Sequence, residues 1–167
     1  MRYLILVLLS FLALFLQTTF FRAFTIGGII PDLILILVVC HALFNGVYQG
    51  TIYGMLCGLL EDLYIGRFIG MNAVSKGITA YVAGRLQGNV FKENVMVGII
   101  GVIGGTLLNF ILLFILSALT FEKFNLDYSI LIKLSYQLLY NTILTVPMYI
   151  WYYHSSHSGW LRETEEY

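Results

Sequence analysis

The length of its apolar segments limits what this chain can fold into. A helix needs about 20 mainly apolar residues to cross a hydrocarbon core of about 30 Å. Five segments meet or nearly meet that length: residues 3–21, 47–65, 69–86, 95–119 and 130–153. A sixth, residues 33–44, is shorter but follows Pro31 and Asp32, which favour a helix start. We therefore expect an all-α polytopic membrane protein, a six-transmembrane-helix bundle.

The composition supports this fold class, because 59% of the 167 residues are hydrophobic and only 11% are charged. The connections are short, so residues 1–153 are predicted to form a single six-span membrane domain, followed by a polar tail, residues 154–167. Nine basic and nine acidic residues cancel, so no basic field indicates nucleic acid. Six spans place both termini on one side of the membrane. Basic residues divide equally between the two sides, so charge alone does not fix the orientation.

Glycines recur every four residues in the third span. These are Gly46, Gly50, Gly54 and Gly58. Small-residue ridges let helices in lipid approach closely, and this ridge is longer than one neighbour requires. We therefore predict that it docks a partner helix. The small residues of the fourth and fifth spans are interpreted as packing within the bundle.

Charged residues gather where the third span ends. Three connections, including the one after this span, must open on the same face, which brings Asp32 near Glu61 and Asp62. A charge inside a membrane needs a partner or a path to the surface, so Lys76 is expected to pair with Asp62 or Glu61, or to snorkel. Arg67 is a second candidate partner for Asp62, and this pairing would fix the turn that presents the glycine ridge. The predicted turn and ion-pair cluster comprises Asp62, Gly66, Arg67, Gly70, Asn72 and Lys76.

No residue pattern indicates catalysis or a cofactor. The sequence contains no nucleophile elbow, phosphate loop, zinc-protease helix or dinucleotide fingerprint. His41 has no second ligand at metal spacing, so we predict a hydrogen bond inside the bundle and no metal. Polar groups of the sixth span, spaced by four, are predicted to bond across helices; they are Gln137, Asn141 and Thr145. We therefore predict that the protein is not an enzyme.

Two stretches, PDLILILVVCHALFNG and GLLEDLYIGRFIGMNAVSKGITAYVAGRL, resemble the MreD family of bacterial rod shape-determining proteins. The family pattern has a Pro-Asp-Leu opening, a Gly-Leu-Leu-x-Asp element, a Gly-x-x-x-Gly-x-Asn-Ala turn and a Gly-Arg ending. The matching residues are Pro31, Asp32, Leu33, Gly58, Leu59, Leu60, Asp62, Gly66, Gly70, Asn72, Ala73, Gly84 and Arg85. The resemblance covers about residues 30–86.

That resemblance implies a multi-pass scaffold of the bacterial inner (cytoplasmic) membrane, with both termini in the cytoplasm. It implies a cell-shape role in the elongasome, which carries out lateral peptidoglycan synthesis. The partners implied are MreC, contacted through its single span, and less directly MreB, RodA and a transpeptidase, within membrane lipid. The resemblance does not determine whether the protein also forms a homodimer. The family's bundle is also similar to the substrate-binding S-components of energy-coupling-factor vitamin transporters.

Two alternatives follow from the polar residues. A small-molecule-binding subunit would use an outward cavity lined by Asp62, Lys76, Asn109, Gln137 and Asn141. The first span argues against it, because its one alanine, Ala13, provides no alanine-spaced coupling motif. A lipid-processing enzyme would need a reactive group near the headgroups, and Glu61 is the one candidate. Charged helix ends near the interface cost little, so Glu61 needs no catalytic explanation.

Overall fold

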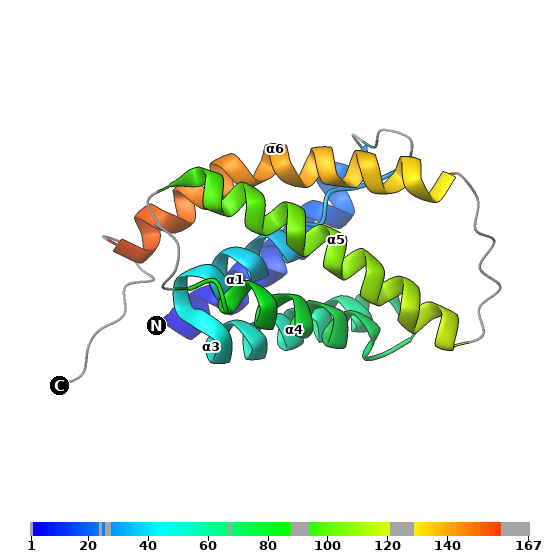
Figure 1. The fold of residues 1–167 in the computed structure, drawn as a ribbon, viewed down its shortest axis with the longest axis horizontal. Helices are drawn as coiled ribbons and strands as arrows, with labels where there is room; N and C mark the ends of the chain where they lie inside the picture. Colours follow the sequence, from blue (N-terminus) through cyan, green and yellow to red (C-terminus); the bar gives the residue numbers. More distant parts are fainter. Residues whose placement is uncertain are drawn as a thin grey trace.

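The computed structural model describes residues 2–23, 25, 28–66, 68–87, 94–120 and 129–157. It is all-α, as predicted, and Figure 1 shows its helices. They are α1 (Arg2–Phe15), the π-helix η1 (Leu16–Phe20), α2 (Phe21–Ala23), α3 (Leu33–Ile65), α4 (Met71–Gly84), α5 (Val95–Leu119) and α6 (Ser129–His157). Among these residues, three helical stretches are long and apolar enough to cross a membrane: Tyr3–Ala23, Leu33–Ile65 and Val95–Leu119.

The 33-residue helix α3 is a hairpin of two arms, residues 33–45 and residues 47–65, joined at Gly46. Gly46 has φ 84° and ψ −173°, a left-handed conformation that side-chain-bearing residues rarely adopt. The arms then run side by side, since a Cβ added to Gly50 would lie 2.6 Å from the Cβ of Ala42. At the turn, Gln87 Nε2 donates to the Phe44 carbonyl oxygen at 2.9 Å and satisfies an acceptor that the broken helix leaves free. The short predicted segment 33–44 therefore corresponds to a separate helical arm.

Consecutive helices run in opposite directions when the two arms of α3 are counted separately. In Figure 1, α1 begins, α3 turns and α6 ends on the left, while the turn between α3 and α4 lies on the right. α5 crosses diagonally between α6 at the top and α3 and α4 below. The start of the first α3 arm and the end of the second arm share one end of the bundle, as the pattern of alternating spans predicted.

Most predicted helix limits agree with the structure to within two or three residues, and α5 spans the predicted residues 95–119. The last helix differs more, because α6 continues through His157 although the polar tail was predicted from residue 154. A helix can continue beyond the apolar run, because its backbone hydrogen bonds do not require apolar side chains. Residues 158–167 of the predicted tail lie outside the described residues.

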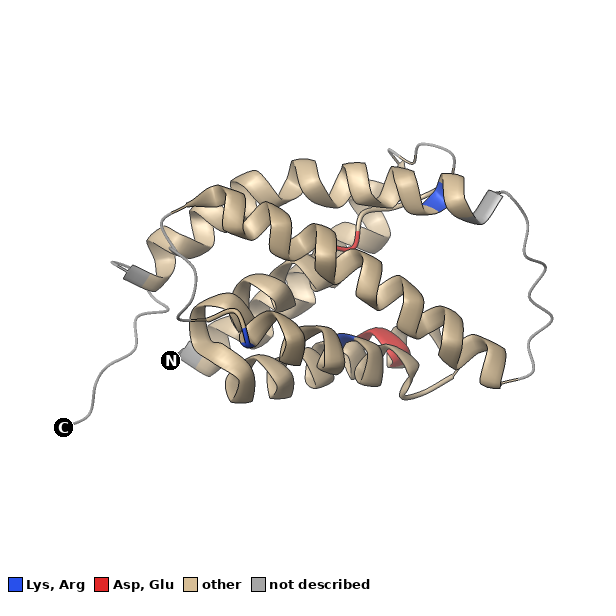
Figure 2. Cartoon of the chain, in the orientation of Figure 1, with Lys and Arg blue, Asp and Glu red and all other residues tan. Residues whose placement is uncertain are grey.

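The first α3 arm forms the centre of the molecule. Every residue from Leu33 to Phe44 is buried, as expected for a helix that is apolar on all sides. α3 is in contact with α1, α4, α5 and α6. The outward faces of the other rods expose large apolar side chains, including Leu8, Leu63, Ile100 and Ile143. Figure 2 shows how few charged residues interrupt the helices, and such an outer surface suits hydrocarbon surroundings.

Candidate functional site

A buried ion cluster lies where α3 begins, where it ends, and along α4. Lys76 Nζ is 2.6 Å from Asp32 Oδ2 and 2.8 Å from Glu61 Oε2. Lys76 is only 1% exposed, so its ammonium does not snorkel. The predicted Lys76–Asp62 pair is wrong, whereas Glu61 was the other predicted partner. From the sequence, Asp32 was interpreted only as a helix start that lies on the same face of the membrane as Glu61 and Asp62.

Amides extend this cluster to the remaining helices. Gln17 Nε2 donates to Glu61 Oε1 at 2.8 Å, and Gln17 Oε1 accepts from the Leu33 backbone N–H at 3.1 Å. Asn141 Oδ1 accepts from the Asp32 N–H at 2.9 Å, and Asn141 Nδ2 donates to Thr106 Oγ1 at 3.0 Å. Asn141 thus bonds across helices, as predicted, whereas Thr145 Oγ1 donates to the Asn141 carbonyl oxygen within α6 at 2.6 Å. We call Gln17, Asp32, Glu61 and Lys76 the core polar cluster; sequence reasoning missed Gln17, whose signal is one amide within an apolar run.

The electrostatics of the core polar cluster favour a structural role. Asp32 also caps α3, because its Oδ1 accepts from the Leu35 N–H at 2.8 Å. Buried ions are tolerated when an opposite charge and hydrogen bonds replace the lost water. Here the Lys76 ammonium contacts two carboxylates, Asp32 at the start of α3 and Glu61 near its end. The arrangement therefore ties α4 to both arms of the hairpin, and its side chains are buried.

Asp62 holds the turn between α3 and α4 without Lys76. Its Oδ2 accepts from the N–H groups of Gly70 at 2.9 Å and Ala73 at 3.1 Å. Its Oδ1 accepts from the Asn72 N–H at 3.1 Å and from Asn72 Nδ2 at 2.9 Å. Gly66 ends α3 with φ 69°, and its N–H donates to the Asp62 carbonyl oxygen. Arg67, the other predicted partner of Asp62, lies outside the described residues.

The hydrogen bonds of Asp62 satisfy the free N–H groups at the start of α4. We expect Asp62→Ala to lower the free energy of unfolding by about 2 kcal/mol, the upper end of losses for helix caps. Amide hydrogen exchange should accelerate at Gly70, Asn72 and Ala73. As a control, Asn94→Ala removes the α5 cap, which makes a single bond to the Met96 N–H, and should cost less. Unchanged exchange at the start of α4 would contradict this role.

The protein's own chain packs against the glycine ridge that was predicted to dock a partner helix. A Cβ added to Gly54 would lie 2.7 Å from the Lys76 carbonyl oxygen, and one on Gly58 would lie 2.6 Å from Ala73 Cα. Gly50 meets Ala42 of the first arm, and Gly46 meets the Gln87 side chain. The close neighbours of these four glycines in the described structure are therefore parts of the same chain. Glycines at intervals of four indicate a closely packed helix, but the spacing is the same whether that helix belongs to this chain or to a partner.

The small residues of α4 face this ridge, as the prediction of packing within the bundle required. Ala80 Cβ would lie 2.9 Å from a Cβ on Gly54, and a Cβ on Gly84 would lie 2.7 Å from Val47 Cα at the hairpin turn. Arg85, next along the chain, is exposed; its Nη2 donates to the Tyr81 hydroxyl and its guanidinium carbon lies 5.0 Å from the centre of that ring. The motif residues Gly84 and Arg85 thus have separate surroundings.

Four of the five residues proposed to line a ligand cavity are engaged in other interactions in the described structure. Asn109 is buried, and its Oδ1 accepts from Ser75 Oγ at 2.7 Å. Lys76 and Asn141 are buried in the interactions given above, and Asp62 is fully engaged at the turn. Two surface hollows, one between α1 and the second α3 arm and one beside α2, contain none of the five residues proposed for that cavity.

His41 takes part in a hydrogen-bonded group inside the bundle, as predicted. Its Nδ1 lies 2.8 Å from the Tyr152 hydroxyl and 3.2 Å from Asn45 Nδ2. Over the described part of the chain, no three His, Cys, Asp or Glu residues gather in a group that could hold a metal. Cys40 and Cys57 are both buried free thiols.

Comparison with known proteins identifies the family. The family model of rod shape-determining protein MreD matches residues 1–155, nearly the whole chain. Neither the curated proteins nor the solved structures contain a significant match. The all-α bundle, its apolar outer surface and the internal use of its charged motif residues agree with a non-catalytic membrane protein. The chain belongs to the MreD family, the rod shape-determining proteins of the cytoplasmic membrane that serve the cell-elongation machinery.

Proposed function

We propose that the protein is a six-span scaffold that docks MreC and thereby supports lateral peptidoglycan synthesis. One observation carries this proposal: the buried charges and the glycine ridge bind the protein's own helices, leaving outward surfaces that are almost entirely apolar. Such surfaces suit other membrane-embedded chains. MreB, RodA and a transpeptidase would be reached through MreC or neighbouring subunits.

The six spans are the rod from α1 to α2, the two arms of α3, and α4, α5 and α6. The first α3 arm, 13 residues from Leu33 to Asn45, is about 20 Å long at 1.5 Å per residue. It is shorter than the hydrocarbon core, but its burial among other helices lets its ends lie inside the protein. Both termini would lie in the cytoplasm, which places the core polar cluster toward the outer face.

We assign MreC docking to the outward face of α5. Gly104 is the one helical glycine in the described chain where an added Cβ would meet no atom within 4 Å. Ile100, Leu107 and Ile111 follow the same face at helical spacing and are exposed. A partner helix can approach its backbone closely at such a glycine, with the larger side chains packing on either side. This face of α5 leaves space for a partner helix, whereas the internal glycine ridge packs against the protein's own chain.

The experiment is to replace Gly104 with leucine and co-purify MreC from bacterial membranes. We expect recovery of MreC to fall about tenfold, a loss of about 1.4 kcal/mol, because the added side chain separates the two helices. Inserted protein and its unfolding temperature should stay at the wild-type level, since space around Gly104 is open. Ile143→Leu, on the exposed face of α6, is the control. Undiminished recovery of MreC with Gly104→Leu would reject this docking face.

A further inference from the structure

A groove runs between α1 and the second arm of α3. It encloses about 280 Å³ and opens on the outer surface of the bundle. Five of its twelve lining residues are aliphatic and three are tyrosines, so most of the wall that a ligand would touch is apolar; His41 and Gln49 also line it. The lining residues include Leu6, Val7, Ile52, Leu56 and Leu60.

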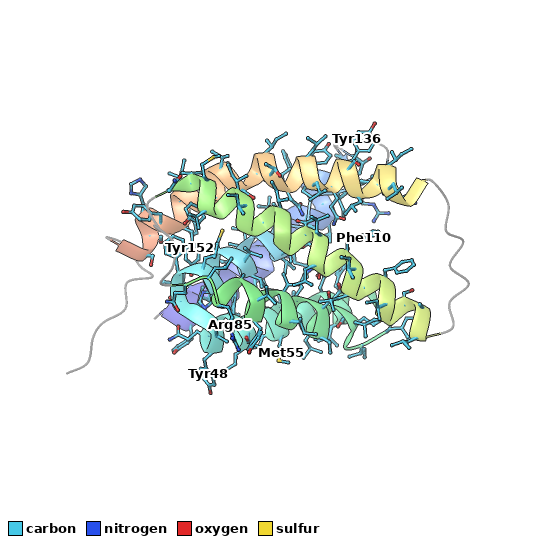
Figure 3. The ribbon with its side chains drawn as sticks, viewed as in Figure 1. Tyr48, Met55, Arg85, Phe110, Tyr136 and Tyr152 are labelled. Atoms are coloured by element: carbon cyan, nitrogen blue, oxygen red, sulfur yellow. The ribbon has the colours of Figure 1, made fainter. Side chains whose placement is uncertain are left out.

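The groove begins at the end of the bundle where α1 starts and α3 turns, and it extends along the second α3 arm as far as Leu60. Tyr48 lies two residues after the hairpin turn, and Leu60 lies twelve residues farther, about 18 Å along a helix. Tyr3 and Tyr48 line the entrance and are 75% and 79% exposed. Figure 3 shows Tyr48 projecting outward. Tyrosines favour the membrane–water interface, so this entrance lies at headgroup level and the groove reaches inward along the acyl chains.

Three polar side chains on the groove floor, Ser10, Tyr53 and Cys57, interact with one another. Ser10 Oγ lies 2.8 Å from the Tyr53 hydroxyl and 3.2 Å from Cys57 Sγ, and it donates to the Leu6 carbonyl oxygen at 2.9 Å. These three side chains are buried. A ligand that needs hydrogen bonds along its length would find few partners here, whereas an apolar chain leaves none of these groups unpaired.

We propose that this groove binds one acyl chain of a membrane phospholipid, with the headgroup beside Tyr3 and Tyr48. A partner helix about 10 Å wide and 18 Å long would occupy roughly 1,400 Å³, far more than the 280 Å³ enclosed. A single hydrocarbon chain lying along the two helices matches both the narrow shape and the apolar walls. The inference rests on the membrane location of the family and is independent of MreC docking on α5.

The test compares phospholipid retention by native mass spectrometry after purification in detergent, followed by addition of phosphatidylethanolamine or phosphatidylglycerol with oleoyl chains. Ile52→Trp should fill the groove, because Ile52 lines it and is 43% exposed. We expect about a tenfold loss of the one-lipid complex, equivalent to about 1.4 kcal/mol, with either headgroup. Leu59→Trp, on the same arm, 38% exposed and outside the groove, is the matched control and should retain lipid.

A second measurement does not depend on the variant folding. The wild-type protein is irradiated with a phospholipid that carries a diazirine in its acyl chain, and the adducts are mapped by peptide mass spectrometry. Adducts should concentrate at Val7, Ile52 and Leu56 and be scarce at Ile143, which is exposed on α6. Equal labelling of Ile143, or unchanged lipid retention by folded Ile52→Trp, would overturn the proposal. Loss of a co-purified protein with lipid retained would also overturn it, by showing a protein occupant.

Discussion

Replacing Lys76 with methionine is expected to lower the free energy of unfolding by about 3 to 5 kcal/mol, as for other buried ion pairs that lose one partner. Asp32 and Glu61 would then lie close together in the bundle without the ammonium that contacts both. Both carboxylates remain buried, so water cannot replace the missing charge. The measurement is thermal and denaturant unfolding of the purified protein in detergent, together with the amount inserted in the membrane.

Two variants separate charge from shape in this prediction. Lys133→Met removes a lysine that is exposed on α6 and should change stability little. The triple variant Lys76→Met, Asp32→Asn, Glu61→Gln removes all three charges and should recover much of the lost stability, because no unpaired ion remains. If Lys76→Met unfolds at the wild-type temperature, the core polar cluster does not hold the bundle together.

Gly58→Ala is expected to lower the free energy of unfolding by about 3 kcal/mol, the upper end for overpacking. The added Cβ would lie 2.6 Å from Ala73 Cα and would also meet the backbone of Asn72. The atoms that the added Cβ would meet belong to the backbone of α4, so α4 itself must move. That movement disturbs the hydrogen bonds of Asp62 to the start of the same helix. Unfolding in detergent measures the loss, and amide exchange along α4 shows whether that helix moves.

Gly104→Ala is the matched control, because it adds the same methyl group to a helical glycine with open space around it. Alanine is also the better helix former, so its stability should equal or slightly exceed that of the wild type. Equal stability of the Gly58 and Gly104 variants would show that the ridge is not tightly packed against α4. The comparison thus measures packing rather than a general effect of losing glycine.

Partner docking shows a limit of sequence reasoning. Four glycines in register indicate a close helix neighbour, and this part of the interpretation holds. The close neighbours are α4 and the first arm of α3. The length of the ridge suggested a second neighbouring helix, and that helix is the first arm of the same hairpin. Gly104 follows Gly98 and Gly101 at intervals of three, so the spacing alone did not show that Gly104 is the one with open surroundings.

The ion pairs show the same limit at the level of single residues. The pattern of alternating spans placed Asp32, Glu61 and Asp62 at one end of the bundle, which the structure bears out. Adjacent residues in a helix point about 100° apart, so Glu61 faces Lys76 while Asp62 faces the turn. Gln17 joins from a helix whose sequence is otherwise apolar.

The sequence by itself determined the all-α membrane class, the approximate helix limits and which helix ends share a face. These depend on apolar length and chain direction, which are local properties. Only the tertiary structure decided which carboxylates contact Lys76, that the glycine ridge faces inward, and that Gly104 faces outward. Those outcomes depend on the rotation of each helix about its axis, which is set by packing against several neighbours at once.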